Sequence, residues 1–194
     1  MVQKIVTVLK SIMANQTDPV VPDNLIPITD LADGYYSINS TANGLALETV
    51  DSGYDNGLLI KQNIASNKSS KTTYFEKQSD GSYVINFYHS KKALDVNSSR
   101  SLTQWSVHKG DNQRWLLYKD NQNNIYIKSK YDNSFIEIKS YNVYDDLLLN
   151  SIINASDTSK QFKLNKLKNL PTIPYVADVA NGLYKIESSF SGKI

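Results

Sequence analysis

Residues 93–115 read ALDVNSSRSLTQWSVHKGDNQRW and combine two short strand patterns with a closing motif. The strand patterns, 93–97 and 102–107, mix apolar with polar residues and are separated by Ser and Arg. Gln113-Arg114-Trp115 then opens a further apolar stretch. A Trp in such a stretch is expected to face the core, because large aromatic side chains dominate core energetics. The stretch predicts a β-hairpin, with Asp95 on its first strand, followed by a core strand.

Looser forms of this pattern recur on both sides, at intervals of about 45 residues. Each form places two apolar residues before an acid, as in Ala46-Leu47-Glu48 and Phe135-Ile136-Glu137. Each also opens on an aromatic residue followed by an apolar one, and ends on a large aromatic residue. The opening pairs are Tyr36/Ile38, Tyr83/Ile85 and, more loosely, Tyr126/Ile127, and the closing residues are Phe75, Trp115 and Phe162.

The alternation predicts four strands in each of three units. They are 35–39, 45–49, 58–62 and 73–77, then 83–87, 93–97, 102–107 and 114–118, then 125–129, 135–139, 147–151 and 161–164. One unit cannot bury its own apolar face, whereas three units that close on one another remove their exposed strand edges. The sequence therefore predicts an all-β fold, a β-trefoil of three four-stranded repeats, with a short N-terminal helix and flanking linkers.

The second unit resembles the ricin B-type lectin family, which occurs as tandem modules in bacterial toxins and haemagglutinins. The matching residues are Ala93-Leu94-Asp95-Val96, Trp105 and Asn112-Gln113-Arg114-Trp115. The resemblance covers roughly residues 33–167. It implies a site in which Asp95 accepts hydrogen bonds from sugar hydroxyls and Trp105 stacks on the sugar ring. It further implies that Asn112 adds polar contacts, that Gln113 supports the site, and that the sugar is galactose or N-acetylgalactosamine.

The chemistry of these four side chains suits a sugar. A carboxylate accepts two hydroxyls, an amide both donates and accepts, and an indole covers the apolar face of a pyranose. A shallow site of this kind binds weakly and gains affinity through multivalency. Two structural alternatives stay open: Trp105 could pack in the core, and Asp95 could bond a local backbone N–H.

The first and third units are expected to keep the fold without binding sugar. They place Glu48 and Glu137 at the position of Asp95, and the longer carboxylates would change the depth of a site. Neither unit has an aromatic residue at the position of Trp105, where Lys61 and Asn150 fall nearest in the alignment.

Composition narrows the remaining chemistry. The chain has 194 residues, no Cys, two His and a formal net charge of +2, which gives no reason to expect a nucleic-acid partner. His89 is interpreted as a turn residue and His108 as a loop residue beside the site. No nucleophile–base pair, carboxylate cleft or phosphate loop is present, so we expect no enzyme activity, no cofactor and no metal site.

The sequence also suggests how the chain is organised. The predicted segments are an N-terminal helix (1–16), a linker (17–30), the ricin B-type β-trefoil (31–168), a second linker (169–180) and the first strand of a truncated second trefoil (181–194). The last prediction rests on the similarity of residues 26–36, IPITDLADGYY, to residues 173–184, IPYVADVANGLY.

These observations favour a lectin module that carries an attached effector, such as a bacterial toxin, to cell-surface glycans. We expect a secreted or extracellular location as part of a larger bacterial protein, with no signal peptide in this chain and with membrane contact only through glycans. The main alternative is a trefoil without a working sugar site that acts as a protein-binding scaffold or spacer. A trefoil protease inhibitor is disfavoured, because no loop resembles a protruding substrate.

The expected tandem arrangement makes a prediction about stability. If residues 181–194 begin another trefoil, the first barrel has no vacant place for them. Deletion of residues 176–194 should then leave the melting temperature unchanged within error, as measured by circular dichroism. A drop of many degrees would contradict the tandem interpretation.

Overall fold

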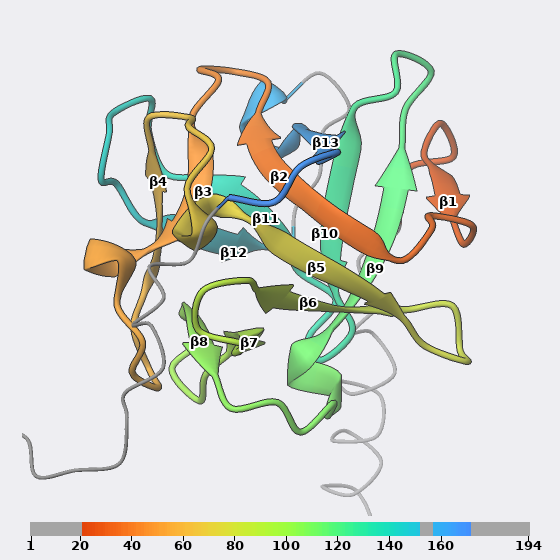
Figure 1. Ribbon diagram of the computed structural model, residues 1–194. Helices are drawn as coiled ribbons and strands as arrows, with labels where there is room; N and C mark the ends of the chain where they lie inside the picture. Colours follow the sequence, from red (N-terminus) through yellow and green to blue (C-terminus); the bar gives the residue numbers. More distant parts are fainter. Residues whose placement is uncertain (1–20, 152–156, 172–194) are drawn as a thin grey trace, which may run out of the picture.

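The computed structural model describes residues 21–151 and 157–171, so the predicted N-terminal helix and second-trefoil strand lie outside the described residues. The described residues form a 13-stranded sheet with four one-turn 3₁₀ helices (Figure 1). The 3₁₀ helices are η1 (Val50–Ser52), η2 (Ser69–Lys71), η3 (Asp111–Gln113) and η4 (Thr158–Lys160). No helix among these residues is long and apolar enough to cross a membrane.

The first and fourth strands of the three units build a closed antiparallel barrel. These strands are β2 (Gly34–Ser40), β5 (Thr73–Lys77), β6 (Tyr83–Phe87), β9 (Arg114–Lys119), β10 (Ile125–Ser129) and β13 (Phe162–Lys166). Each pairs with the next, and β13 pairs with β2. Because the ring is closed, the barrel leaves no long unpaired strand edge.

The second and third strands of each unit form a hairpin at one end of the barrel. The hairpins are β3 (Ala46–Thr49) with β4 (Ile60–Asn63), β7 (Ala93–Val96) with β8 (Leu102–Trp105), and β11 (Phe135–Ile138) with β12 (Leu147–Asn150). The third strands β4, β8 and β12 contact one another. Three four-stranded units around one barrel confirm the predicted β-trefoil.

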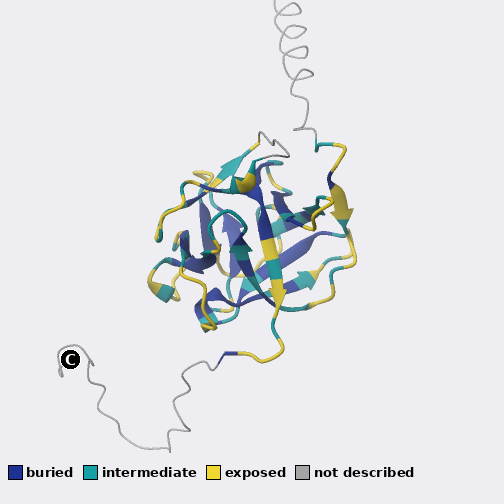
Figure 2. Ribbon diagram, turned by 90° about the horizontal axis from the view of Figure 1, so that it is seen from above, coloured by how far each residue is buried: buried dark blue, intermediate teal, exposed yellow. Residues whose placement is uncertain are grey.

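The barrel interior holds the main apolar core, and buried residues follow the strands through the centre of the molecule (Figure 2). Phe75, Trp115 and Phe162 are all fully buried, as predicted. The strand register shows, however, that these three aromatic residues are not all equivalent by the three-fold symmetry. In the second and third units the closing aromatic lies opposite the opening residue, as the pairs Tyr83–Trp115 and Ile125–Phe162 show. In the first unit, Tyr36 lies opposite Thr73. The first unit therefore has Thr73 where the others have their closing aromatic, and Phe75 fills the barrel one inward-facing position later.

The first inward-facing residue of the third unit is also one position earlier than the sequence pattern predicted. Ile125 occupies the register position of Tyr83, so Tyr126 is not the equivalent of the opening tyrosines. Tyr126 is instead buried in a separate small cluster with Leu25 and Phe135. A strand that is buried on both faces loses the alternation that would reveal its register.

A short additional strand, β1 (Ile26–Ile28), lies within the segment predicted as a linker. It pairs with Leu117–Lys119 of β9. Each strand has two edges, and β10 pairs along one edge of β9. Along the other edge, β6 pairs only with Arg114 and Trp115, so residues 117–119 remain available there. The strand thus exists because it completes an otherwise unpaired edge, which a search for local periodicity does not detect.

The two tryptophans should differ sharply in their effect on stability. Trp115 is 0% exposed and its Nε1 donates to the Leu94 carbonyl at 3.2 Å, whereas Trp105 is 43% exposed. Trp115→Ala should lower the free energy of unfolding by about 3–5 kcal/mol, measured by denaturant titration. The matched Trp105→Ala should cost about 1 kcal/mol or less. Equal losses would contradict the placement of the core.

Candidate functional site

The site predicted around Asp95 is assembled by β7 and the 3₁₀ helix η3. Asp95 lies on β7 and is only 3% exposed. Its Oδ2 accepts a hydrogen bond from Gln113 Nε2 at 2.8 Å and another from Asn112 Nδ2 at 3.0 Å. The structure therefore brings together three of the four predicted site residues. The donors are side-chain amides, so the alternative that Asp95 bonds a local backbone N–H does not hold for these contacts.

Gln113 is fully buried and holds the neighbouring loop in place. Its Nε2 also donates to the Ser106 carbonyl at 3.0 Å, and its Oε1 accepts from the backbone N–H groups of His108 and Lys109. One amide thus fixes both the carboxylate of Asp95 and residues 106–109. This network explains why Gln is required here, since only an amide offers two donors and an acceptor in one plane.

Trp105 ends β8 and is exposed, so the alternative that it packs in the core is wrong. A loop of the first unit lies beside it. A Cβ added to Gly57 would approach Trp105 Cζ3 to 3.5 Å, and Gly57 has a φ of +81°, which favours glycine. Asn56 Nδ2 donates to Ser106 Oγ at 3.1 Å, and Asn56 Oδ1 accepts from Ser106 N at 3.0 Å. Asn56 and Gly57 of the first unit therefore form one side of the site in the second unit.

The carboxylate of Asp95 keeps capacity for a further partner. Within the described residues, Oδ1 accepts no hydrogen bond, while Oδ2 holds both amides. Burial raises the pKa of Asp95, and the hydrogen bonds from Gln113 and Asn112 together with nearby His108 offset this only in part. His108 Nε2 lies 3.7 Å from Asp95 Oδ2. The arrangement offers an acceptor, an amide and an exposed indole at one place.

In the first unit the corresponding carboxylate is fully engaged inside the protein. Glu48 is buried and accepts hydrogen bonds from Ser52 Oγ at 2.7 Å, Asn63 Nδ2 at 2.6 Å and Ser70 Oγ at 2.5 Å. Lys71 Nζ lies 3.0 Å from its Oε2. Burial would raise the pKa of Glu48, but these hydrogen bonds outweigh it and lower the pKa to about 2. No capacity for a ligand remains on this carboxylate.

The third unit repeats the same arrangement. Glu137 accepts from Asn150 Nδ2 at 2.8 Å and Ser159 Oγ at 3.0 Å, and Lys160 Nζ lies 3.2 Å away. Lys160 also binds Asp157 at 2.6 Å. Lys71, Gln113 and Lys160 each end the 3₁₀ helix of their unit. The sequence motifs did not reveal this buried lysine, which lies two positions before Thr73 in the first unit and two positions before Phe162 in the third.

The strand register also identifies the residues that replace Trp105. Asn63, Trp105 and Asn150 each lie opposite the first residue of the second strand of their unit. The alignment of Asn150 with Trp105 is therefore correct, whereas Lys61 is two residues away and pairs with Asp146 at 3.4 Å. Both asparagines donate to the glutamate of their own unit. The four residues at this position therefore change together from unit to unit. The first and third units have Glu, Asn, Ser and Lys, whereas the second has Asp, Trp, Asn and Gln.

Two further features concern metal and histidine chemistry. In the part of the chain that the structure describes, no group of three or more His, Asp or Glu side chains could hold a metal ion. His89, interpreted from the sequence as a turn residue, is buried, with Nε2 2.8 Å from the Gly53 carbonyl and 3.2 Å from Thr49 Oγ1. It therefore fixes the loop that precedes Gly57 and lies outside the Asp95 site.

Solved structures share this architecture. The designed three-fold symmetric protein ThreeFoil matches with a TM-score of 0.65 and 24% identity, covering 70% of this chain and 100% of that one. A mosquitocidal holotoxin matches with a TM-score of 0.65 and 13% identity, over 71% of this chain and 18% of its own. A Polyporus squamosus lectin, bound to the human-type influenza-binding epitope Neu5Aca2-6Galb1-4GlcNAc, matches with a TM-score of 0.57 and 20% identity, over 70% and 50%. These likenesses concern the fold.

No curated protein matches the chain in sequence. Two overlapping segments, residues 26–103 and 73–146, match the family described as "Ricin-type beta-trefoil lectin domain-like". The first match begins at β1, and both lie within the described residues. The chain belongs to the ricin-type β-trefoil lectin-like family.

Proposed function

We propose that the chain binds carbohydrate through its second unit. Asp95 accepts sugar hydroxyls on Oδ1, Trp105 stacks on the sugar ring, Asn112 makes a further polar contact, and Gln113 holds the carboxylate and the loop. The observation that carries the proposal is the difference between units. Glu48 and Glu137 are each neutralised by a lysine and bonded by Asn and Ser, whereas Asp95 is bonded only through Oδ2.

The proposed ligand is a galactose-type sugar, galactose or N-acetylgalactosamine, on a cell-surface glycan. A single shallow site would bind one sugar weakly, so multivalency or an attached partner would supply the avidity. We propose that the module targets an attached effector, such as a bacterial toxin domain, outside the cell. The match to a holotoxin, of which this chain covers 18%, is compatible with a module inside a larger protein.

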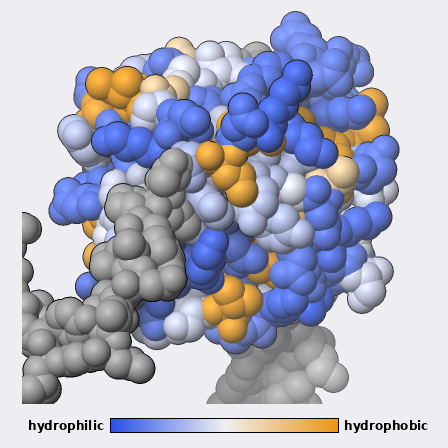
Figure 3. All heavy atoms as spheres, in the orientation of Figure 1, coloured by the Kyte–Doolittle hydropathy of each residue, from blue (hydrophilic) through white to orange (hydrophobic). Residues whose placement is uncertain are grey.

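A protein-binding scaffold is the second candidate, because a fold does not fix a function. On the face drawn in Figure 3, however, apolar side chains form small patches separated by polar ones. Broad apolar patches are the usual mark of a protein-binding surface. An exposed indole beside a partly unpaired carboxylate instead favours a polar ligand with an apolar face, and it favours binding over catalysis.

Replacement of Asp95 tests the site. Asp95→Asn preserves shape and an oxygen for the two amides, but it places a donor where the sugar hydroxyl needs an acceptor. We expect at least a tenfold loss of galactoside affinity by isothermal titration calorimetry, which corresponds to about 1.4 kcal/mol. This variant is better than Asp95→Ala, which would leave buried Gln113 with an unpaired N–H at a cost of about 1–3 kcal/mol.

The matched control is Glu137→Gln. It changes the equivalent carboxylate in the third unit while Lys160 keeps Asp157 as a partner. Its galactoside affinity should equal that of the wild-type protein. The proposed function is wrong if the wild-type protein binds no glycan, and the assignment of the site is wrong if Asp95→Asn and Glu137→Gln behave alike.

Acidification should separate binding from folding. The pKa of Asp95 is raised above its usual 3.8, so the carboxylate is protonated, and one acceptor is lost, early in an acid titration. The pKa of Glu48 is lowered to about 2, so its stabilising contribution is complete above its unfolded pKa of 4.5 and disappears only as the pH falls through about 2. Galactoside binding should therefore decline at a higher pH than the melting temperature does, and a simultaneous decline would contradict this order.

A further inference from the structure

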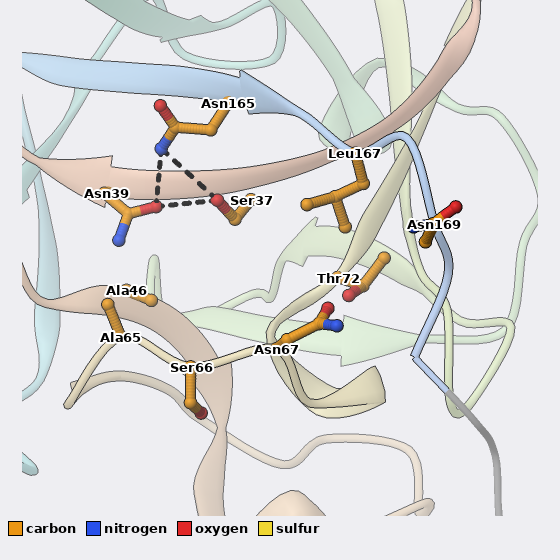
Figure 4. A pocket seen from close by; sticks show the side chains of 10 residues that line it. All are labelled: Ser37, Asn39, Ala46, Ala65, Ser66, Asn67, Thr72, Asn165, Leu167 and Asn169. Carbon is orange, nitrogen blue, oxygen red and sulfur yellow. Dashed lines mark hydrogen bonds between the residues drawn. The ribbon is translucent and has the colours of Figure 1, made fainter.

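Two pockets lie at equivalent boundaries between units, on the flank of the barrel. One, of about 340 Å³, contains Asn39 and Ala65 of the first unit and Asn165 of the third (Figure 4). The other, of about 280 Å³, contains their register equivalents Asn86, Val107 and Glu76. Asn39 and Asn86 lie opposite Ala46 and Ala93, respectively, which establishes the equivalence. The trefoil thus carries a second type of pocket, separate from the carboxylate positions.

The two pockets differ in chemistry. In the first pocket, Asn39 Oδ1 accepts from Ser37 Oγ at 2.8 Å and Asn165 Nδ2 at 3.1 Å, and no aromatic side chain lines the wall (Figure 4). The second pocket is lined by three tyrosines, and we name it the tyrosine cleft. Its lining residues are Tyr35, Tyr74, Glu76, Asn86, Phe87, Tyr88, Lys91 and Val107. Only the tyrosine cleft combines an aromatic surface with charged and amide groups.

The three tyrosines of the cleft form a cluster of rings that contact one another at steep angles. Tyr35 and Tyr74 are register partners on β2 and β5, with ring centroids 5.0 Å apart, and Tyr88 packs edge-on against Tyr35 at 5.1 Å. Their neighbours Tyr36 and Phe75 face the core, so these rings face outward. Rings in mutual contact do not form a cage around a cation, and of these three rings the Lys91 ammonium lies over that of Tyr88 alone. The Tyr35 and Tyr74 rings meet at 54° and the Tyr35 and Tyr88 rings at 78°, so the apolar face of a pyranose would stack on one ring and contact the edge of another.

Polar groups surround this cluster of rings. Lys91 Nζ lies 4.0 Å from the Tyr88 ring centroid and is available as a donor at the rim. Asn86 Oδ1 is buried and has no hydrogen-bond partner among the described residues. A buried acceptor without a partner is costly and is usually satisfied by water or ligand. Asn86 lines the cleft, and a small movement of its side chain would bring this shielded oxygen within reach of a ligand hydroxyl.

A single loop separates the tyrosine cleft from the Asp95 site. Val107 lines the cleft, whereas the next residue, His108, lies against Asp95. Lys109 Nζ then binds Glu76 of the cleft at 2.5 Å. Gln113 holds this same loop through the backbone of His108 and Lys109. The two sites therefore lie on either side of one loop, which Gln113 holds in place.

We propose that the tyrosine cleft binds a second sugar residue of the glycan whose first residue occupies the Asp95 site. The inference rests on the proposed function and deepens it, because it makes the ligand an oligosaccharide. The cleft volume lies just below the usual range for small-molecule sites, which suits one monosaccharide residue and is small for a peptide segment. An extended ligand would contact both sides of the loop at once.

The test compares a monosaccharide with longer glycans. Wild type and Tyr88→Ala are titrated calorimetrically with methyl galactoside and with the galactose-terminated oligosaccharide that binds best on a glycan array. We expect Tyr88→Ala to weaken oligosaccharide binding about tenfold and to leave methyl galactoside binding within twofold. Val107→Arg, on an exposed loop, blocks the cleft without removing a tyrosine and should have the same effect.

Tyr131→Ala is the matched control, because Tyr131 is exposed in the third unit and does not line the cleft. It should change neither affinity. If wild type binds glycans but Tyr88→Ala and Val107→Arg leave oligosaccharide affinity unchanged, the inference is overturned while the proposed function stands. Equal losses for monosaccharide and oligosaccharide also overturn it. If wild type binds neither ligand, the proposed function itself fails, and this inference with it.

Discussion

In every unit, a carboxylate on the second strand binds the 3₁₀ helix that leads into the fourth strand. The contacts are Glu48 with Ser70 and Lys71, Asp95 with Asn112 and Gln113, and Glu137 with Ser159 and Lys160. This contact ties each hairpin to the barrel, because the second strand belongs to the hairpin and the fourth to the barrel. The fold requires the contact three times, but it does not require the same partner each time.

The choice of partner determines what the carboxylate can still do. A buried lysine neutralises Glu48, and the other donors complete its coordination, so that its pKa falls to about 2. Removing one member of such a pair would leave an unpaired buried charge, at a cost of about 3–5 kcal/mol. Gln113 holds Asp95 without supplying a positive charge, and burial raises the pKa of Asp95. A buried carboxylate without a full counter-charge is the kind of local conflict that proteins retain at functional sites.

Repeated local patterns in the sequence predicted the trefoil, which the structure confirms, whereas the resemblance to the ricin B-type family supplied the residues assigned to the Asp95 site. The repeated apolar-apolar-acid strand specifies each hairpin, and Gln113-Arg114-Trp115 supplies the amide and the core aromatic together. The same reasoning failed at positions where a unit departs from the repeated pattern. Thr73 stands where an aromatic was expected, and Asn63, not Lys61, replaces Trp105, because only the strand register defines these equivalences. Features made between units, such as Gly57 beside Trp105 or Tyr35 beside Tyr88, depend on tertiary contact and leave no local signal.

If one carboxylate of three remains open to ligand, the number of sugars bound per chain shows it most directly. Native mass spectrometry of the wild-type chain with a simple galactoside, with affinity confirmed by calorimetry, gives that number. One galactoside per chain is expected at saturation. A second or third galactoside that stays bound in the Tyr88→Ala variant would show that the lysine-paired glutamates still admit sugar, and none bound to the wild-type chain would show that the amide-held carboxylate of Asp95 is as structural as the other two.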